Sequence, residues 1–401
     1  MIYTRHLMKV TFADNEIEIR KPPEVVLEVC KEETDRLDAI NASSAAVQGC
    51  SEGDCVEPHS SFYQSINAYA HAYWHVHPYI SLIICVFGII TNIVNIYVLC
   101  KEKMRNSINC ILTGIAISDI IIMADYIPFA IHFYLATGLR DIEERYTYFW
   151  STYLMVHSCL SNTTHTVSLW LAVVMSAIRY LFIRSRGRWN LTLYRTRLAI
   201  ICVYLACIIV FIPNYTLTGL VAVVLPSNTT VYRMKSLSIY LGNSTTMNTI
   251  NVWLFILIGK LVPCALICIL GCMLLKTIKK SVQLTESLKL TSCSRRMRAH
   301  RRTTVMLLAI MTMFIISELP AAILVLISVF VDNFFKDYYL LFADTLDIVS
   351  LTNNAINFVM YCIMSRQFRD SLCETLPFCR VRIGRRSSEP AATTTNLRGS
   401  A

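Results

Sequence analysis

Seven long apolar segments follow one another along the chain and constrain its fold more than any other feature. We place them at about residues 78–100, 108–135, 149–183, 196–220, 249–277, 300–331 and 338–364. Each is long enough to cross about 30 Å of hydrocarbon, which takes roughly 20 helical residues. Segments of this length in lipid predict helices, because a barrel strand is far shorter. The sequence therefore predicts an all-α membrane protein, a seven-transmembrane helix bundle.

Lysine and arginine concentrate in alternate connections between these segments. Only 16% of the residues are charged, against about a quarter in soluble domains. The basic connections are the first, third and fifth, whose residues include Lys101, Lys103, Arg105, Arg184, Arg186, Arg188, Lys276, Lys279, Lys280, Arg295, Arg296 and Arg298. Basic loops remain in the cytoplasm, so we expect the N-terminus outside and the C-terminus inside. Membrane topology then explains the formal net charge of +10, and we expect no nucleic-acid partner.

The segments divide the chain into three parts. Residues 1–74 are polar and mixed, and we expect a largely disordered extracellular tail. Residues 75–375 form the seven-helix domain, and residues 376–401 are expected to be a disordered cytoplasmic tail. Three Asn-x-Ser/Thr sequons on the predicted outer side are expected glycosylation sites: Asn41, Asn228 and Asn243.

Cysteines outside the apolar segments suggest covalent modification. Cys50 and Cys55 lie in the N-terminal region and would form a disulfide if that region is extracellular. Residues 365–370 mix basic and aromatic side chains, which predicts a short amphipathic eighth helix on the inner face of the lipid bilayer. Cys373 and Cys379 follow as candidate palmitoylation sites, with unmodified thiols as the alternative.

Polar residues inside the predicted helices need partners, because an unpaired polar group in hydrocarbon is costly. Asn92 lies in the first helix, Asp119 in the second, and Asn353 and Asn357 in the seventh. The last two are four residues apart and share a helix face. We expect Asn92, Asp119 and Asn357 to form a network that holds water and an ion, with sodium near Asp119 as the candidate cofactor. Plain interhelical hydrogen bonding is the alternative.

Acidic, aromatic and histidine side chains gather toward the outer half of the predicted bundle. Glu318 stands two residues before Pro320, which removes a backbone hydrogen bond and kinks the sixth helix. Asp344 and Asp347 share a face near the outer end of the seventh helix. The other candidate pocket residues are Tyr126, Phe129, His132 and His157. Such walls suit a cationic, aromatic ligand, and core packing is the alternative for each residue.

Several motifs fall in order on these segments and resemble a known receptor class. Arg179 and Tyr180 close the third segment before a basic loop, and Tyr361 stands four residues after Asn357 in the seventh. The matching stretches lie at residues 91–119, 126–128, 165–180, 260–264, 317–320 and 353–369. Together they resemble the rhodopsin-like G-protein-coupled receptors. More narrowly they are similar to the invertebrate myosuppressin and FMRFamide-type peptide receptors, which are relatives of the sex peptide receptor.

The resemblance implies a multi-pass receptor of the plasma membrane for an amidated neuropeptide. It would signal through a heterotrimeric G protein of the inhibitory type, and arrestin is a further expected partner. The resemblance implies that Arg179, Tyr180 and Tyr361 serve G-protein coupling, and that an arginine of the peptide pairs with one of the pocket carboxylates. The expected mechanism is a population shift, in which peptide binds better to a conformation with the sixth helix swung outward.

Four positions depart from the pattern of the class. Ile178 replaces the usual acid before Arg179, and Phe358 replaces the proline of the usual Asn-Pro-x-x-Tyr motif. Glu318 stands where the class has a tryptophan. The usual cysteine pair between the top of the third helix and the fourth loop is missing, with Leu154 near its site. These departures bring into question the common disulfide and the usual resting-state lock on Arg179.

Other functions are compatible with parts of the sequence. An orphan or chemosensory seven-helix receptor for a small molecule is the first alternative, since no residue pattern excludes it. A transporter or channel is a remote alternative, because no repeat relates the two halves. Lys260 does not indicate a retinal protein, since the seventh segment contains no lysine. No nucleophile–base pair or metal-ligand spacing indicates an enzyme.

Overall fold

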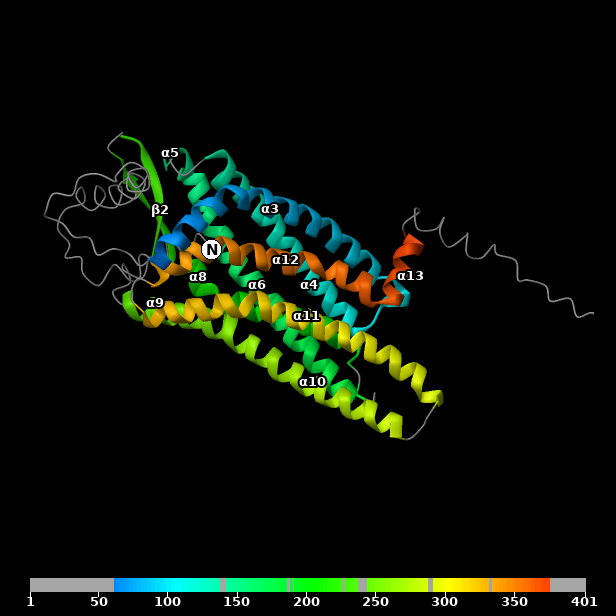
Figure 1. The fold of residues 1–401 in the computed structure, drawn as a ribbon. Helices are drawn as coiled ribbons and strands as arrows, with labels where there is room; N and C mark the ends of the chain where they lie inside the picture. The colour runs from blue at the N-terminus through cyan, green and yellow to red at the C-terminus, as the bar shows by residue number, and fades with distance from the viewer. Residues whose placement is uncertain are drawn as a thin grey trace, which may run out of the picture.

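The computed structural model describes most of the chain as one elongated helix bundle (Figure 1). The described residues are 61–137, 142–185, 188–189, 191–225, 228–236, 244–287, 291–331 and 334–375. Within them, seven helices are long and apolar enough to cross a membrane. This confirms the predicted all-α, seven-helix fold. The expectations for Asn41, Cys50, Cys55, Asn243 and Cys379 lie outside the described residues.

The elements follow the predicted order, with a β-hairpin after the fourth membrane helix. Their bounds are α3 Ser61–Leu99, η2 Glu102–Met104, α4 Ser107–Ala130, η3 Ile131–Ala136, α5 Ile142–Arg145, α6 Tyr148–Arg184, α7 Leu193–Val210, α8 Ile212–Thr216, β1 Thr218–Val224, β2 Thr230–Ser236, α9 Ser244–Ile256, η5 Leu257–Leu261, α10 Val262–Ser287, α11 Thr291–Phe330, η6 Phe335–Tyr339, α12 Leu340–Met364 and α13 Arg366–Thr375. Three of these, η3, η5 and η6, are π-helical turns that adjoin membrane helices. The short helix α13 follows α12 directly, as the amphipathic pattern predicts.

Side-chain caps explain where several helices begin. The Asn106 side chain accepts a hydrogen bond from the backbone N–H of Asn109 at the start of α4. Thr147 and Thr192 cap α6 and α7 in the same way. Such caps satisfy one of the N–H groups that a helix leaves unpaired at its first turn. The predicted starts of these helices therefore agree with the observed ones to within a few residues.

The first helix is longer than predicted. Hydropathy placed its start at about residue 78, but α3 begins at Ser61 and runs through Pro78. Residues 61–74, assigned above to the disordered tail, are therefore helical. Aromatic stacking supports this extension, since the rings of Tyr69 and Tyr73 stack 5.6 Å apart. The Tyr69 hydroxyl also lies 3.0 Å from the Thr345 hydroxyl on α12.

The fourth membrane helix is shorter than predicted. The expected segment reached residue 220, but α7 ends at Val210 and Pro213 opens the separate short helix α8. The β-branched residues that follow favour a strand, and β1 pairs with β2 in an antiparallel hairpin, with Val221 opposite Arg233. Asn228 in the turn has φ 63°, a left-handed conformation that asparagine tolerates.

The hairpin sits at the end of the bundle opposite α13 (Figure 1). The Ser151 hydroxyl donates a hydrogen bond of 2.7 Å to the carbonyl of Tyr232, and the Tyr232 N–H donates to the carbonyl of Tyr146 at 2.8 Å. Leu154 of α6 and Met234 of β2 belong to the same buried cluster. Hydrogen bonds and apolar packing thus attach the fourth loop to the third membrane helix.

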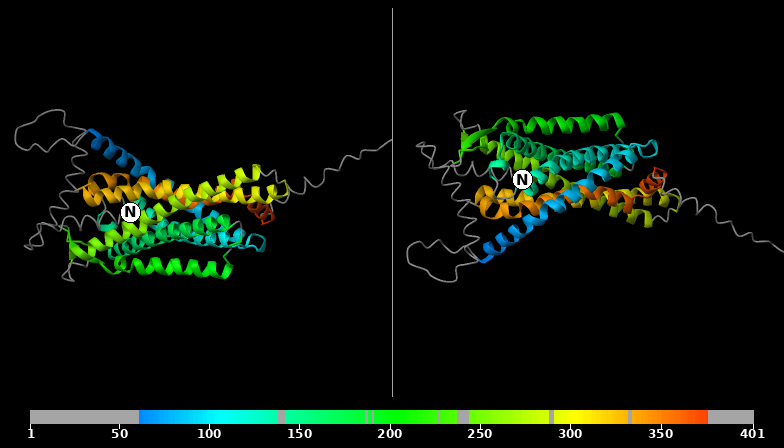
Figure 2. Two further views of the ribbon diagram at one scale, coloured as in Figure 1. Left: turned by 90° about the horizontal axis from the view of Figure 1, so that it is seen from below. Right: turned by 90° about the horizontal axis from the view of Figure 1, so that it is seen from above.

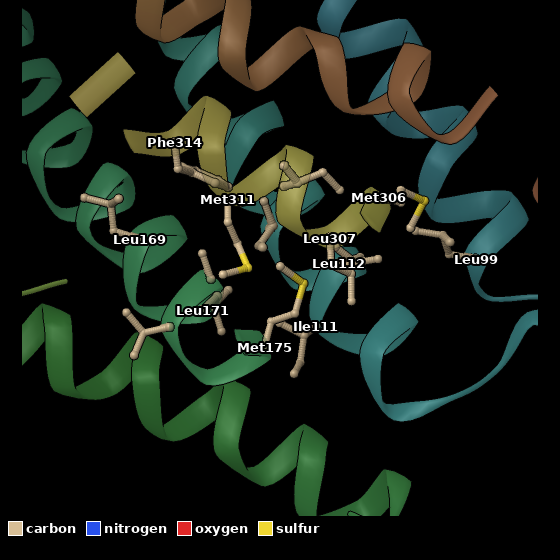
Figure 3. Packing of buried hydrophobic residues seen from close by; sticks show 14 of the residues in the cluster. Leu99, Ile111, Leu112, Leu169, Leu171, Met175, Met306, Leu307, Met311 and Phe314 are labelled. Carbon is tan, nitrogen blue, oxygen red and sulfur yellow. The ribbon is translucent and has the colours of Figure 1, made fainter. Parts of the chain in front are cut away.

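Helix α6 is the centre of the bundle and α7 is at its edge. Of the most apolar part of each helix, 61% is buried in α6 but only 11% in α7. Figure 2 shows α7 along one side of the bundle and the first turns of α3 leaning away from it. The largest core cluster packs α4, α6 and α11 together (Figure 3), with Ile111, Leu112, Leu169, Leu171, Met175, Leu307, Met311 and Phe314 among its residues.

We predict that Gly88→Ala destabilises the bundle. A Cβ atom at Gly88 of α3 would lie 2.2 Å from Sδ of Met123 and 3.0 Å from Cβ of Ala355. The Met123 side chain, which is fully buried, would have to move within a packed core, and overpacking of this kind costs about 1–3 kcal/mol. The thermal unfolding temperature of the purified protein in detergent should therefore fall by several degrees.

Gly271→Ala is the matched control for this prediction. Its Cβ atom would lie 3.4 Å from Cε of Met311, which is an ordinary contact. Alanine also favours a helix over glycine by about 1 kcal/mol. We expect an unchanged or higher unfolding temperature, and equal temperatures for the two variants would contradict the close approach at Gly88.

Candidate functional site

A pocket lies between α6, η5, α11 and α12, in the half of the bundle that carries the hairpin. Its polar lining consists of Ser161, Asn162, His165, Lys260, Ser317, Glu318, Asp347 and Ser350. Its apolar lining consists of Phe255, Ala321, Val325, Tyr339 and Leu346. The pocket thus combines charged and hydroxyl groups with an aromatic and aliphatic wall, and it is more polar than most ligand sites, which are lined mainly by apolar side chains.

Glu318 lies at the base of this pocket and is surrounded by partners from three other helices. The Lys260 ammonium group donates a hydrogen bond to one carboxylate oxygen of Glu318. The Ser350 hydroxyl donates to the other oxygen at 3.0 Å, and Nδ1 of His165 lies 3.8 Å from it. Glu318 is only 3% exposed and Lys260 only 9%. A buried carboxylate is tolerated because its charge is paired and hydrogen-bonded.

Local backbone features bring the two charges together. Lys260 lies in the π-helical turn η5, three residues before Pro263 of α10. Glu318 lies two residues before Pro320 inside α11. Each proline lacks the N–H that would complete the helix hydrogen bonding, and π-turns occur often at functional sites. The pair therefore joins two helices where the backbone of each departs from regular α-helix.

The predicted pocket residues separate into distinct environments. Glu318 and Asp347 both line the pocket, but three of the predicted aromatic and histidine residues lie in a neighbouring buried cluster. There the Phe129 ring stacks on the His157 ring at 4.3 Å, and the Tyr126 hydroxyl shares a hydrogen bond of 2.8 Å with Nε2 of His77. These three residues pack α4 against α3 and α6 and are not among the residues that line the pocket.

Asp344 and His132 are also absent from the pocket lining. Asp344 is buried and accepts a hydrogen bond of 2.8 Å from the Tyr134 hydroxyl. His132 stacks on Trp150 with ring centroids 3.6 Å apart. The structure therefore brings together only two of the seven predicted ligand residues, Glu318 and Asp347, at one pocket.

The predicted intramembrane network is assembled in part by direct contacts. The Asn357 side chain donates a hydrogen bond of 3.1 Å to Oδ2 of Asp119. The Asn92 side chain donates to the backbone carbonyl of Asn354 at 3.0 Å. Asn353 is buried on α12 beside Asn354. These contacts tie α12 to α3 and α4 at the middle of the bundle.

The predicted coupling residues lie at the end of the bundle near α13. Nε and a terminal nitrogen of Arg179 donate hydrogen bonds to the Thr304 hydroxyl of α11, at 3.1 and 2.9 Å. Ile178, the residue before Arg179, is buried and packs in the main core cluster. Tyr361 is buried with its ring 5.3 Å from that of Phe368. Arg179 therefore links the third and sixth membrane helices directly.

Several important residues were missed as site residues by the sequence argument. The sequence relates Lys260 to a retinal linkage and to the matching stretch 260–264 but not to the pocket, and no sequence pattern marks Ser350. Asp125 pairs with His157 at 2.7 Å and was also missed. The sequence does contain a signal for the pair of Lys260 and Glu318. These residues carry opposite charges inside apolar segments, each shortly before a proline, and charges inside membrane helices usually pair.

The candidate modification sites lie at opposite ends of the bundle. Asn228 is exposed in the turn between β1 and β2, on the predicted outer side. Cys373 is partly exposed in α13, on the predicted inner side. Glycosylation of Asn228 and palmitoylation of Cys373 stay predictions.

Comparisons with known proteins agree with this architecture. Residues 79–379 match the family described as Serpentine type 7TM GPCR chemoreceptor Srw. The G-protein coupled receptor dmsr-1 of Caenorhabditis elegans is 27% identical over 379 residues, which cover 82% of this chain and 74% of that protein. The sex peptide receptor of Drosophila melanogaster is 24% identical over 313 residues, which cover 72% of this chain and 69% of that receptor. The FMRFamide receptor of Drosophila melanogaster is 21% identical over 300 residues, covering 72% of this chain and 51% of that receptor.

The family match includes the apolar cores of all seven membrane helices and the helix α13 that follows them. This is a family of receptors, whose partners are a ligand and a G protein. The chain therefore belongs to the Serpentine type 7TM GPCR chemoreceptor Srw family and is a multi-pass membrane G-protein-coupled receptor.

Proposed function

We propose that the chain is a plasma-membrane receptor for an amidated neuropeptide that contains arginine, and that it signals through an inhibitory heterotrimeric G protein. The observation that carries this proposal is the charge of the pocket. Two carboxylates, Glu318 and Asp347, line it together with a single lysine, Lys260. The two carboxylates of the lining outnumber its one lysine, which pairs with Glu318, and this excess of acidic lining residues favours a cationic ligand.

The rest of the lining supports the choice of peptide. Phe255, Tyr339 and Leu346 offer a wall for an aromatic side chain. An amidated C-terminus carries no negative charge, so it avoids the repulsion that a free carboxylate would meet beside Asp347. The names of two relatives, the sex peptide receptor and the FMRFamide receptor, support a peptide ligand.

A small-molecule chemosensory receptor is the second candidate, favoured by the description of the matching family. Calcium release in cells that express the chain with a promiscuous G protein separates the two. A nanomolar response to a panel of amidated peptides ending in Arg-Phe supports the peptide proposal. Silence across the panel, with the receptor verified at the cell surface, would exclude it in favour of a small molecule.

We predict that Asp347→Asn weakens the response to the active peptide by roughly tenfold or more, the loss expected for one charge-assisted bond of about 1.4 kcal/mol or more. A peptide with citrulline in place of arginine should lose similar potency on the wild-type receptor. On Asp347→Asn the citrulline peptide should lose little more, because both changes remove the same interaction.

Asp344→Asn is the matched control for this prediction. It makes the same chemical change three residues away, where the carboxylate binds Tyr134 and does not line the pocket. We expect it to change peptide potency much less than Asp347→Asn. Additive losses for Asp347→Asn and citrulline would remove Asp347 as the partner of the peptide arginine.

We predict that Arg179→Gln abolishes G-protein activation and preserves peptide binding, because Arg179 lies at the cytoplasmic end, far from the pocket residues. Radioligand binding and nucleotide exchange on the same membranes would show the separation. Arg195→Gln is the control, since Arg195 is an exposed arginine in the first turn of α7, at the edge of the bundle, and is not one of the predicted coupling residues. Retained activation by Arg179→Gln would count against its coupling role.

We further propose that a sodium ion binds near Asp119. Oδ1 of Asp119 and Oδ1 of Asn92 and Asn95 are buried without hydrogen-bond partners among the described residues, and carboxylate and amide oxygens suit a hard cation. We predict that replacing choline by sodium lowers agonist affinity in the wild-type receptor but not in Asp119→Asn. Equal sodium sensitivity of the two proteins would exclude this site.

A further inference from the structure

We infer that the ion pair between Lys260 and Glu318 is an autoinhibitory clamp. It holds α11 against η5 and α10, and a bound ligand activates the receptor by separating the two charges. The inference deepens the proposed function and rests on it for the cationic ligand. The clamp itself depends on the contacts of Glu318.

The ion pair suits a clamp because it lies where α11 can bend. Glu318 lies just before Pro320, where α11 lacks a backbone hydrogen bond, so the helix can bend there. Lys260 lies in η5, whose π-helical turn is also irregular. The irregular backbone at η5 and at Pro320 constrains the angle between α10 and α11 only weakly. The attraction between Lys260 and Glu318 therefore fixes this angle.

Helix α11 makes a second contact that fixes its position, near its cytoplasmic end. Arg179 of α6 donates two hydrogen bonds to Thr304 of α11. Pro320 lies between Thr304 and the outer end of α11, so a change of angle at the proline moves Thr304 relative to Arg179. Release at Glu318 would therefore open the end of the bundle at which a G protein binds.

Both charges of the clamp lie at the pocket. Glu318 and Lys260 both line the pocket, together with Asp347. Losing Lys260 would leave the buried carboxylate with only Ser350 and His165 close to it, which is costly in a low-dielectric interior. A cationic group of the ligand compensates this cost, so it binds more tightly when Lys260 has moved away. That difference in affinity is what a ligand needs to shift a conformational equilibrium.

The test measures the position of α11 with neither ligand nor G protein present. Spin labels are introduced through non-canonical amino acids at Tyr194, at the start of α7, and at Val305 of α11, both of which are exposed. Double electron–electron resonance then reports the distance between the labels in purified receptor in lipid nanodiscs. The variants are K260Q/E318Q, which removes both charges, and K260E/E318K, which exchanges them.

We expect K260Q/E318Q to add a population with a longer distance between the labels, and the exchanged pair K260E/E318K to restore the short distance. The basal rate of nucleotide exchange on a G protein should rise several-fold in K260Q/E318Q and should be close to the wild-type rate in K260E/E318K. Wild-type distances in folded K260Q/E318Q would overturn the clamp. A long distance that persists in folded K260E/E318K would also count against it, since attraction would not be the cause.

An exposed ion pair supplies the matched control. Lys103 and Glu374 lie 3.0 Å apart with side chains 72% and 49% exposed, and they join the first cytoplasmic loop to α13. K103Q/E374Q makes the same chemical change without touching α11, so the distance should stay at its wild-type value.

A second variant keeps the test decisive if K260Q/E318Q does not fold. K260M/E318M replaces the pair by apolar side chains, a change that buried ion pairs often tolerate, and the same longer distance is expected. Failure of the peptide panel would refute the proposed ligand without altering the distances. Unchanged distances would refute the clamp even if a peptide activates the receptor.

Discussion

A carboxylate or ammonium group inside a membrane helix bundle is costly unless it is paired or hydrogen-bonded, and this constraint organises the interior of the receptor. Lys260 and Glu318 satisfy it across η5 and α11. Asp119 is bonded by Asn357 across α4 and α12, and Asp125 is bonded by His157 across α4 and α6. The contacts of Glu318 and of Asp125 join consecutive membrane helices, and the contact of Asp119 joins two helices that are distant in sequence. The polar interior therefore determines which helices are tied together and where.

Other contacts compensate for the departures from the pattern of related receptors. Ile178 cannot hold Arg179 electrostatically, but Thr304 on α11 accepts two hydrogen bonds from the arginine. Leu154 cannot form a disulfide, but it shares a buried cluster with Met234 of the hairpin. An ionic link is replaced at Arg179 by hydrogen bonds to an uncharged acceptor, and a covalent link is replaced at Leu154 by apolar packing. Such contacts are individually weaker and more easily rearranged.

The fold was largely predictable because the lipid environment makes hydropathy a strong signal. Seven apolar segments became seven helices, and the predicted starts of α4, α6 and α7 fell within a few residues of their caps. The errors have a common cause, since hydropathy reports contact with lipid and not the extent of a helix. It missed the polar and aromatic start of α3 at Ser61, and it extended the fourth helix through α8 into the first residues of β1.

The site was less predictable because its residues come from separate helices. The sequence by itself determined that the chain spans a membrane seven times, and that acids, histidines and a lysine lie inside it. It also indicated the receptor class through the order of its motifs. Only the tertiary structure decided that Glu318 pairs with Lys260, that Asp347 shares their pocket, and that Asp344 binds Tyr134 instead. A helix periodicity shows which residues share a face, but the rotation and contacts of each helix depend on how all seven pack together.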